Sequence, residues 1–286
     1  MINVSELLAK SIPWLKAKGV ENAKLDAETL LAKVLGCKRL ELILQFERPV
    51  ATAEQDAYRE LMKRRGNGEP VAYLVGTRGF HELEFAVGPG VLVPRPETEL
   101  LVELGAARAG RPRADGSHAR ILDVGTGSGC IAISLAHQLP DATVIAVDRS
   151  KEALAIARRN VDALAPGRVE LRESDGFGAV RADERFDVIV SNPPYIPSGD
   201  IAGLMRDVRD FEPRAALDGG GDGLACIRPW AKEAFARLAP GGWCFFEIGA
   251  GQGDAARACF AEAGFVEISL TDDLARIPRV VGGMRP

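Results

Sequence analysis

The sequence predicts an α/β protein: a doubly wound, mostly parallel sheet preceded by a small amino-terminal helical bundle and a hairpin connector. Two observations carry this prediction. From Ile121 onward, short β-branched runs alternate with helical segments, as in parallel sheets with crossover helices. Before residue 66, apolar residues recur at helical spacing instead. We therefore expect a helical domain over residues 1–75, a connector over 76–110 and an α/β domain over 111–286.

Composition indicates a globular protein with ample core. Lys and Arg number 36 against 40 Asp and Glu, a net charge of −4 that does not suggest a nucleic-acid surface. No apolar run approaches a membrane span and residues 1–6 do not resemble a signal peptide, so a cytoplasmic location is expected. The five cysteines are never paired as C-x-x-C and the three histidines are scattered, so we expect no disulfide and no metal site.

The amino-terminal region is expected to form several helices between Ser5 and Arg65. Ser5 is the predicted first N-cap, and Pro13 should shorten or kink the first helix. Thr52-Ala53-Glu54-Gln55 has the form of a capping box ahead of a helix that ends near Gly66. This bundle carries no catalytic constellation, so we expect it to hold a partner. A purely structural cap is the alternative.

The connector begins with a predicted hairpin over residues 79–87. Residues 91–99 contain two prolines and lead into a helix that should end near Ala109. Residues 111–120 are rich in Arg, Gly, Pro and Asp without periodicity, which indicates a loop or mobile linker.

The α/β domain should alternate strands and helices regularly, which implies a parallel sheet with right-handed crossovers. Strands are expected at residues 121–124, 143–148, 169–172, 186–190 and 243–248. Helices are expected at residues 130–139, 151–164, 224–238 and 252–263.

A glycine-rich loop, Gly125-Thr126-Gly127-Ser128-Gly129, joins the first strand to its helix. Its glycines let the backbone turn sharply and approach a ligand closely, beside a helix amino terminus. The spacing is G-x-G-x-G, whereas the last glycine of the dinucleotide fingerprint would fall at Cys130. A pyrophosphate site is therefore disfavoured.

Aspartates follow the next two strands. Asp148 is placed to accept hydrogen bonds from both hydroxyls of a ribose. Asp175 is placed to accept from an adenine amine, with Phe177 covering the ring. Each feature alone is a weak signal, but together they describe an adenosine pocket without a phosphate cradle. The ligand that fits is S-adenosylmethionine.

Ser191-Asn192-Pro193-Pro194-Tyr195 follows the strand at residues 186–190, at the edge of the sheet where ligands of open α/β proteins bind. Two consecutive prolines fix two φ angles and remove two backbone donors. The remaining polar groups are the Asn192 amide and bare carbonyls, beside the aromatic face of Tyr195. Such a corner can hold an amide or aromatic amine flat. An ordinary strand-to-loop turn is the alternative.

The chain resembles the release-factor glutamine methyltransferases of the HemK/PrmC type essentially from end to end. The resemblance rests on the helical domain and on four motifs: Pro94-Arg95-Pro96-Glu97-Thr98-Glu99, the loop at residues 123–129, residues 192–195 and Phe211-Glu212-Pro213. It implies a Rossmann-like methyltransferase sheet of seven strands. It also implies methyl transfer from S-adenosylmethionine to the side-chain amide of the glutamine in the Gly-Gly-Gln motif of class 1 peptide-chain release factors.

The resemblance also implies roles for residues. The loop at residues 125–129, Asp148 and Asn192 should contact the cofactor, which leaves as S-adenosylhomocysteine. Residues 192–195 should bind the glutamine, with Asn192, Pro193 and Tyr195 as catalytic residues. Some members have an aromatic residue directly after the equivalent of Asp175, where this chain has Gly176 and then Phe177, so either of these two is a candidate for the adenine contact.

Class 1 release factors are thus the expected partner, with no membrane and no nucleic acid. The alternatives are the same chemistry on a glutamine of a ribosomal protein or on an adenine of nucleic acid, although the chain offers no separate target-recognition domain. A nicotinamide-dependent oxidoreductase is disfavoured by Cys130 and by the lack of an evident hydride-transfer acid. A noncatalytic adenosine-binding module is disfavoured by the intact corner.

Overall fold

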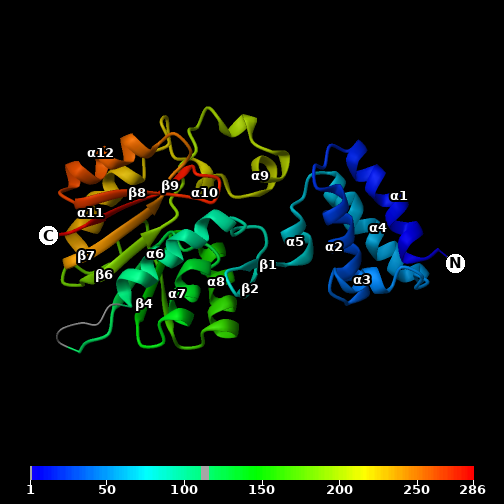
Figure 1. The fold of residues 1–286 in the computed structure, drawn as a ribbon, viewed down its shortest axis with the longest axis horizontal. Helices are drawn as coiled ribbons and strands as arrows, with labels where there is room; N and C mark the ends of the chain where they lie inside the picture. The colour runs from blue at the N-terminus through cyan, green and yellow to red at the C-terminus, as the bar shows by residue number, and fades with distance from the viewer. Residues whose placement is uncertain (1, 111–115) are drawn as a thin grey trace. The chain divides into compact units, whose positions relative to one another are not determined.

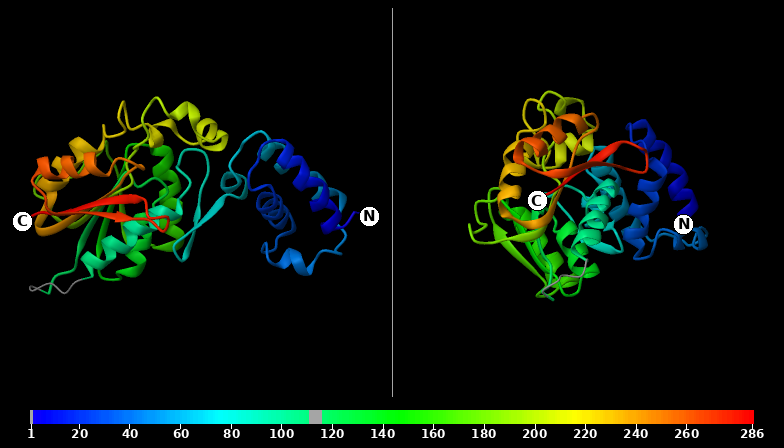
Figure 2. Two further views of the ribbon diagram at one scale, coloured as in Figure 1. Left: turned by 45° about the horizontal axis from the view of Figure 1, so that its top comes forward. Right: turned by 60° about the vertical axis from the view of Figure 1, so that its left-hand side comes forward.

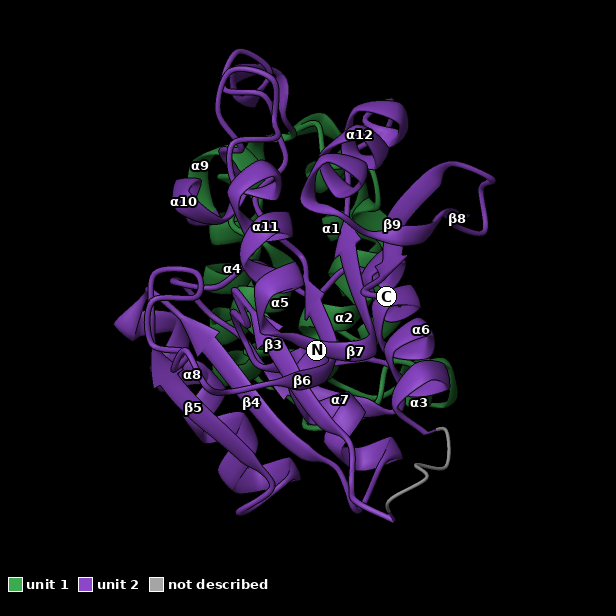
Figure 3. Ribbon diagram, turned by 90° about the vertical axis from the view of Figure 1, so that its left-hand side faces the viewer, with its two compact units in different colours: residues 1–77, 205–211 green, residues 78–204, 212–286 purple. Residues whose placement is uncertain are grey.

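The computed structural model describes residues 2–110 and 116–286, and the chain divides into two compact units. Figure 3 colours them separately: Met1–Thr77 with Met205–Phe211, and Arg78–Leu204 with Glu212–Pro286. Of the loop predicted at residues 111–120, residues 111–115 lie outside the described residues, residues 116–119 have no regular secondary structure, and Arg120 begins a strand.

The first unit is helical, and its core is built from the apolar residues that recur at helical spacing, including Leu8, Leu15, Leu30 and Leu31. Its helices are α1 (Val4–Ala17), α2 (Ala23–Leu35), α3 (Glu41–Leu44), α4 (Thr52–Gly66), α5 (Val71–Val75) and α9 (Arg206–Phe211).

Helix α9 comes from a segment that was predicted to belong to the α/β domain. Its Asp207 lies 3.4 Å from the Arg65 guanidinium of α4, which also pairs with Asp26 of α2 at 2.6 Å. This arginine therefore ties three helices of the first unit together.

The N-cap predictions in this unit were wrong. Asn3 rather than Ser5 caps α1, because the Asn3 side chain accepts from the Glu6 amide at 2.9 Å while the Glu6 carboxylate accepts from the Asn3 amide at 3.3 Å. Helix α1 continues past Pro13 to Ala17, so the proline does not shorten it.

Thr52 is likewise not a cap but the first residue of α4, since the Glu54 carboxylate accepts from the preceding amide of Ala51 at 2.8 Å. The predicted end of this helix at Gly66 is confirmed.

The predicted hairpin is confirmed as a two-stranded sheet of β1 (Thr77–Phe80) and β2 (Leu83–Ala86), and all of it except Thr77 belongs to the second unit. The short 3-10 helix η1 (Pro96–Thr98) then leads into α6 (Glu99–Ala109), which ends where predicted.

The main sheet has seven strands in the order β5-β4-β3-β6-β7-β9-β8. They are β3 (Arg120–Val124), β4 (Thr143–Asp148), β5 (Val169–Glu173), β6 (Phe186–Ser191), β7 (Leu238–Glu247), β8 (Val266–Asp272) and β9 (Pro278–Met284). Strands β3 to β7 are parallel, and β9 runs antiparallel to both β7 and β8. Figure 2 shows the β8–β9 pair in red at the carboxyl end of the chain. The predicted doubly wound, mostly parallel sheet is confirmed.

Helices cover both faces of this sheet (Figure 1). Helices α6, α7 (Cys130–Gln138) and α8 (Lys151–Leu164) pack on one face, and α11 (Ile227–Arg237) and α12 (Gly253–Ala263) on the other. The connection from β6 to β7 also contains η2 (Ile201–Gly203) and α10 (Arg214–Leu217).

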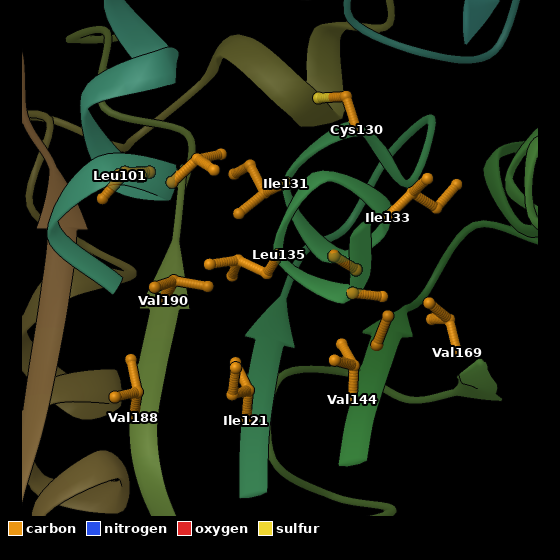
Figure 4. Close-up of a cluster of buried hydrophobic side chains, with 14 of the residues drawn as sticks. Leu101, Ile121, Cys130, Ile131, Ile133, Leu135, Val144, Val169, Val188 and Val190 are labelled. Carbon is orange, nitrogen blue, oxygen red and sulfur yellow. The ribbon is translucent and has the colours of Figure 1, made fainter. Parts of the chain in front are cut away.

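Alternate residues of each central strand enter opposite cores, as expected for a sheet covered on both faces. In β3, Ile121 packs toward α7 and Leu122 toward α11. Figure 4 shows the first of these cores, in which Leu135 of α7 lies over the side chains of β3 and β6. The sheet is thus held between two apolar layers, and its strand ends are the natural place for polar groups.

No helix in the described ranges is both long and apolar enough to cross a membrane. Within the same ranges, no group of three or more His, Cys, Asp and Glu side chains is placed to hold a metal ion. The five cysteines are free, and three of them, Cys130, Cys244 and Cys259, are buried.

Candidate functional site

A cavity of about 270 Å³ lies in the second unit at the carboxyl ends of β3, β4 and β6. Strand β3 pairs with β4 on one side and with β6 on the other, so the order of connections reverses there. In doubly wound sheets this reversal opens a crevice between the loops that leave the two directions. The loops after all three strands line the cavity, together with residues 90–98 and α11.

The glycine-rich loop forms one wall. Its three glycines have φ angles of 75°, 57° and 84°, in the left-handed region that favours glycine. The amides of Gly125 and Thr126 donate to the Val147 carbonyl at 2.9 and 3.0 Å. The Asn160 amide of α8 donates to the Ser128 carbonyl at 2.8 Å. The loop is therefore fixed from two sides, and its residues 125–128 line the cavity whereas Gly129 does not.

Asp148, at the end of β4, also lines the cavity. Its Oδ2 accepts from the Gly127 amide at 2.8 Å, and its Oδ1 accepts from the Ser150 amide at 2.9 Å. Each carboxylate oxygen has a second acceptor direction. The side chain is therefore oriented by the backbone and still able to accept from two hydroxyls, which fits the predicted ribose contact.

Beyond β5, Asp175 and Gly176 line the cavity, whereas Phe177 packs in the core and does not. Gly176 has a φ of 54°, and a Cβ atom there would lie 2.7 Å from the indole nitrogen of Trp230. Trp230, from α11, is the only aromatic residue among the described residues that line the cavity. It meets Phe177 edge to face with 6.5 Å between ring centroids. The absence of a side chain at residue 176 thus makes room for the indole.

We call residues 191–195 the proline corner. It contributes Asn192 and Pro194 to the cavity, while Pro193 and Tyr195 are not among the residues that line the cavity. The corner is anchored at both ends. The Ser191 hydroxyl donates to the Val124 carbonyl at 2.6 Å, which joins the ends of β6 and β3. After the corner, the Gln252 amide donates to the Tyr195 carbonyl at 2.8 Å.

A buried hydrogen-bond chain lies behind the corner. The Asn192 amide nitrogen Nδ2 donates to Thr98 Oγ1 at 3.0 Å, and the Thr98 hydroxyl donates to Glu247 Oε2 at 2.6 Å. The Tyr195 hydroxyl donates to the other oxygen, Oε1, at 3.1 Å. Burial raises the pKa of Glu247 to about 7, and burial together with the Glu247 charge raises the pKa of Tyr195. The Glu247 carboxyl group is thus hydrogen-bonded directly to Tyr195 and, through Thr98, to Asn192.

The proline-rich segment before α6 is held by the Phe-Glu-Pro motif. The Glu212 carboxylate accepts from the Arg95 guanidinium at 2.6 Å and from the Val93 amide at 3.2 Å. Pro94, Arg95 and Thr98 all line the cavity. Two motifs more than a hundred residues apart therefore meet at one wall of the cavity.

Trp230, Glu247 and Gln252 carry parts of this site that the sequence patterns did not reveal. Glu247 was the only one with a visible signal, because it is a carboxylate in an otherwise apolar strand. Trp230 lies within α11 and Gln252 is the N-cap of α12, and neither has a recognisable motif around it.

The raised pKa of Glu247 predicts a pH dependence of stability. The pKa rises from 4.5 to about 7 on folding, so between these values the folded chain keeps a proton that the unfolded chain has lost. The free energy of unfolding should therefore fall as pH rises through this window, by about 3 kcal/mol from this group. Urea unfolding of Glu247→Gln should show a shallower fall between pH 5 and pH 8. The same fall in both proteins would contradict the assigned shift.

Comparison with known proteins gives matches along most of the chain. Residues 6–76 match the family model described as the PrmC N-terminal domain, and residues 98–206 match the methyltransferase small domain. The release factor glutamine methyltransferase of Geobacter sulfurreducens is 46% identical over 270 residues, which cover 94% of this chain and 92% of that protein. The protein of the same name from Burkholderia pseudomallei is 45% identical over 268 residues, with 92% of each chain covered.

Among solved structures, a 16S rRNA methyltransferase of T. thermophilus in complex with AdoMet and guanosine superimposes with a TM-score of 0.53. It is 22% identical to this chain, and the match covers 73% of this chain and 50% of that one. At this identity the match shows the shared methyltransferase fold alone.

Proposed function

The chain belongs to the family of release factor glutamine methyltransferases, and we propose that it methylates the side-chain amide nitrogen of the glutamine in the Gly-Gly-Gln motif of class 1 peptide-chain release factors. One observation supports this most directly. Asn192 of the proline corner and Asp148 of the adenosine site line the same cavity. An amide held by the first therefore lies beside a cofactor held by the second.

The donor is S-adenosylmethionine, which supplies an electrophilic methyl group on its sulfonium. The residues that line the cavity fit S-adenosylmethionine. Residues 125–128 and Asp148 would hold its ribose, and Asp175, Gly176 and Trp230 would surround its adenine ring. The backbone amides of Gly125, Thr126 and Gly127 already donate to the Val147 carbonyl and to Asp148, so these three are not free to cradle a phosphate.

In the corner, the proposed task of the protein is orientation. Asn192 Oδ1 and the Pro193 carbonyl would accept the two hydrogens of the glutamine amide, with Tyr195 packed on the amide plane. Accepting both hydrogens aims the nitrogen at the methyl group, and such positioning contributes about 7 to 11 kcal/mol. As the bond from the amide nitrogen to the methyl carbon forms, the carbon–sulfur bond breaks, and its electron pair stays on the sulfur of neutral S-adenosylhomocysteine. Asn192, Pro193 and Pro194 carry no ionisable group, so the methylated amide then loses its extra proton to water.

Asp148→Ala should weaken binding of S-adenosylhomocysteine by about 1 to 3 kcal/mol, because two ribose hydroxyls lose their acceptor. Calorimetry measures this directly, with Asp162→Ala on the exposed side of α8 as the matched control. An unchanged affinity in folded Asp148→Ala protein would remove Asp148 from the site.

Trp230 is the residue that we propose lies against the adenine. Stacking of a base on an aromatic side chain contributes about 1 to 3 kcal/mol, so Trp230→Ala should weaken S-adenosylhomocysteine binding about fivefold or more, and Trp230→Phe should weaken it less. Titration with S-adenosylhomocysteine should also change the tryptophan fluorescence of the wild type and of the control variant Trp14→Phe, but not that of Trp230→Phe. A fluorescence change that survives in Trp230→Phe would place the adenine elsewhere.

We propose that the helical domain, residues 1–75, recognises the protein substrate. Around α3 it exposes four large apolar side chains within one short segment: Leu40, Ile43, Leu44 and Phe46. Contiguous exposed apolar residues are typical of protein interaction sites. We define these four side chains as the α3 patch.

The second candidate is the same chemistry on a ribosomal protein or on nucleic acid, because the proline corner also resembles that of amino-methyltransferases acting on bases. The experiment is a direct comparison of acceptors. The protein is incubated with labelled S-adenosylmethionine and, separately, a class 1 release factor, ribosomal proteins and DNA. Label in the release factor alone is the expected result, and label in nucleic acid instead would overturn the proposal. A cytoplasmic location stays a prediction.

A further inference from the structure

We propose that Thr98 and Glu247 are positioning residues that fix which end of the Asn192 side-chain amide faces the acceptor. This inference rests on the proposed function, since Asn192 is the residue that would hold the glutamine. Neither Thr98 nor Glu247 needs to touch the substrate for this role.

An asparagine side chain has two ends of nearly the same shape, and hydrogen bonding alone decides which end points where. With Oδ1 toward the cavity, Asn192 accepts a hydrogen from the glutamine amide. With Nδ2 toward the cavity, it would present a donor to a donor. The two prolines that follow fix the backbone, but they do not distinguish these two orientations of the side chain. Something else must set the orientation.

The buried chain behind the corner sets it. A hydroxyl has a single proton, and the Thr98 hydroxyl donates it to Glu247 at 2.6 Å. The only role left to Thr98 Oγ1 is that of acceptor, so it requires a donor from Asn192 and receives one from Nδ2 at 3.0 Å. The direction of donation therefore runs from Asn192 through Thr98 to the carboxylate, which leaves Oδ1 for the substrate.

The surroundings favour a single direction. Thr98 and Glu247 are 2% and 1% exposed, so little water competes for their hydrogen bonds. The charged groups that act on Glu247 are Arg279, which favours its ionised form, and Glu97, which opposes it. Glu247 also accepts from Tyr195, so the same carboxylate restrains the last residue of the corner. The ionised carboxylate, which is favoured by raising the pH to 8, can only accept hydrogen bonds.

The first test removes the hydroxyl. At pH 8, Thr98→Val should lower kcat for release factor methylation about tenfold or more, because the Asn192 amide loses the partner that orients it. The KM for the release factor should change little. Thr98→Ser keeps the hydroxyl and should stay near the wild type. Equal kcat values in Thr98→Val and the wild type would overturn the proposal.

A second test reverses the direction of donation. In Asn192→Asp, an acceptor replaces the donor that faces Thr98, and the single Thr98 proton cannot serve both the introduced carboxylate and Glu247. Adding Glu247→Gln supplies a donor to Thr98, whose proton is then free for residue 192. Glu247→Gln should therefore lower kcat in the wild type but raise it in Asn192→Asp. A purely structural role for Glu247 predicts a loss in both backgrounds.

A third measurement needs no acceptor and so separates this inference from the proposed function. The side-chain NH2 signal of Asn192 is assigned in nitrogen-15 NMR spectra by its loss in Asn192→Asp. Its hydrogen exchange should be about tenfold faster or more in Thr98→Val and unchanged in Thr98→Ser. Unchanged exchange in Thr98→Val would overturn the proposal that Thr98 and Glu247 orient the Asn192 amide. A wild-type protein that exchanges as expected but does not methylate release factors would overturn only the proposed function.

Discussion

Asn192→Ala should lower the turnover number for release factor methylation about a hundredfold or more, the usual loss when one oriented polar group of a site is removed. The variant keeps both prolines and Tyr195, so the glutamine still enters the corner but loses one of its two acceptors. Because the contact aims the nitrogen rather than anchoring a large protein, the loss should fall on kcat and not on KM. Steady-state methyl transfer to a folded release factor measures both.

Asn192→Asp is the companion variant. A carboxylate still accepts from the glutamine, but it places a negative charge beside the cationic sulfonium and faces Thr98 with the wrong polarity. Partial activity is the expected result. Wild-type turnover in Asn192→Ala would mean that the corner is only a turn.

Deleting residues 1–75 should raise KM for the intact release factor about tenfold or more while changing the affinity for S-adenosylhomocysteine far less, because we place the two binding sites in different parts of the chain. The deletion also removes the partners of α9, since Asp207 pairs with Arg65 in the first unit. Calorimetric binding of S-adenosylhomocysteine is therefore measured first, as the check that the truncated protein is folded. Equal activity of truncated and full-length proteins would leave the bundle as a structural cap.

A point variant tests the same idea without shortening the chain. Leu44 of the α3 patch is 87% exposed, and Leu44→Glu places a charge there without disturbing a core. Leu274→Glu is the matched control, because Leu274 is fully exposed but lies in the second unit. KM should rise in the first variant and not in the second.

The elements that the sequence predicted well are those with a regular pattern and clear ends. The strand at Thr143–Asp148 and the helix at Lys151–Leu164 are where we expected them, since a β-branched run and an amphipathic helix are separated by the cap Ser150. Strands β8 and β9 were not located individually. Strand β8 is mostly exposed, and β9 contains Gly282 and Gly283, which are more typical of a turn.

The structure supplies the reason for those two glycines. A Cβ atom at Gly282 would lie 2.7 Å from the Phe245 ring, and one at Gly283 would lie 2.9 Å from Phe265. Phe245 of β7 and Phe265, which lies just before β8, therefore leave no room for a side chain at these two positions, and no pattern of neighbouring residues reveals this.

The same contrast holds in the site. The glycine loop, Asp148 and the proline corner are short contiguous motifs at strand ends, so their chemistry can be recognised from neighbours in the chain. Thr98 and Glu247 meet across 149 positions, and their hydrogen bond follows only from the folded sheet. Trp230 enters the cavity because Gly176 leaves room for it, which is also a tertiary effect.

Peptide mapping by tandem mass spectrometry shows directly which residue of a class 1 release factor is methylated after incubation with this protein and S-adenosylmethionine. We expect one added methyl group, on the side chain of the glutamine in the Gly-Gly-Gln motif, and none when Asn192→Ala replaces the wild type in a matched short incubation. A methyl group on another residue, or an unmodified release factor under conditions where the protein binds S-adenosylhomocysteine, would contradict the proposed function.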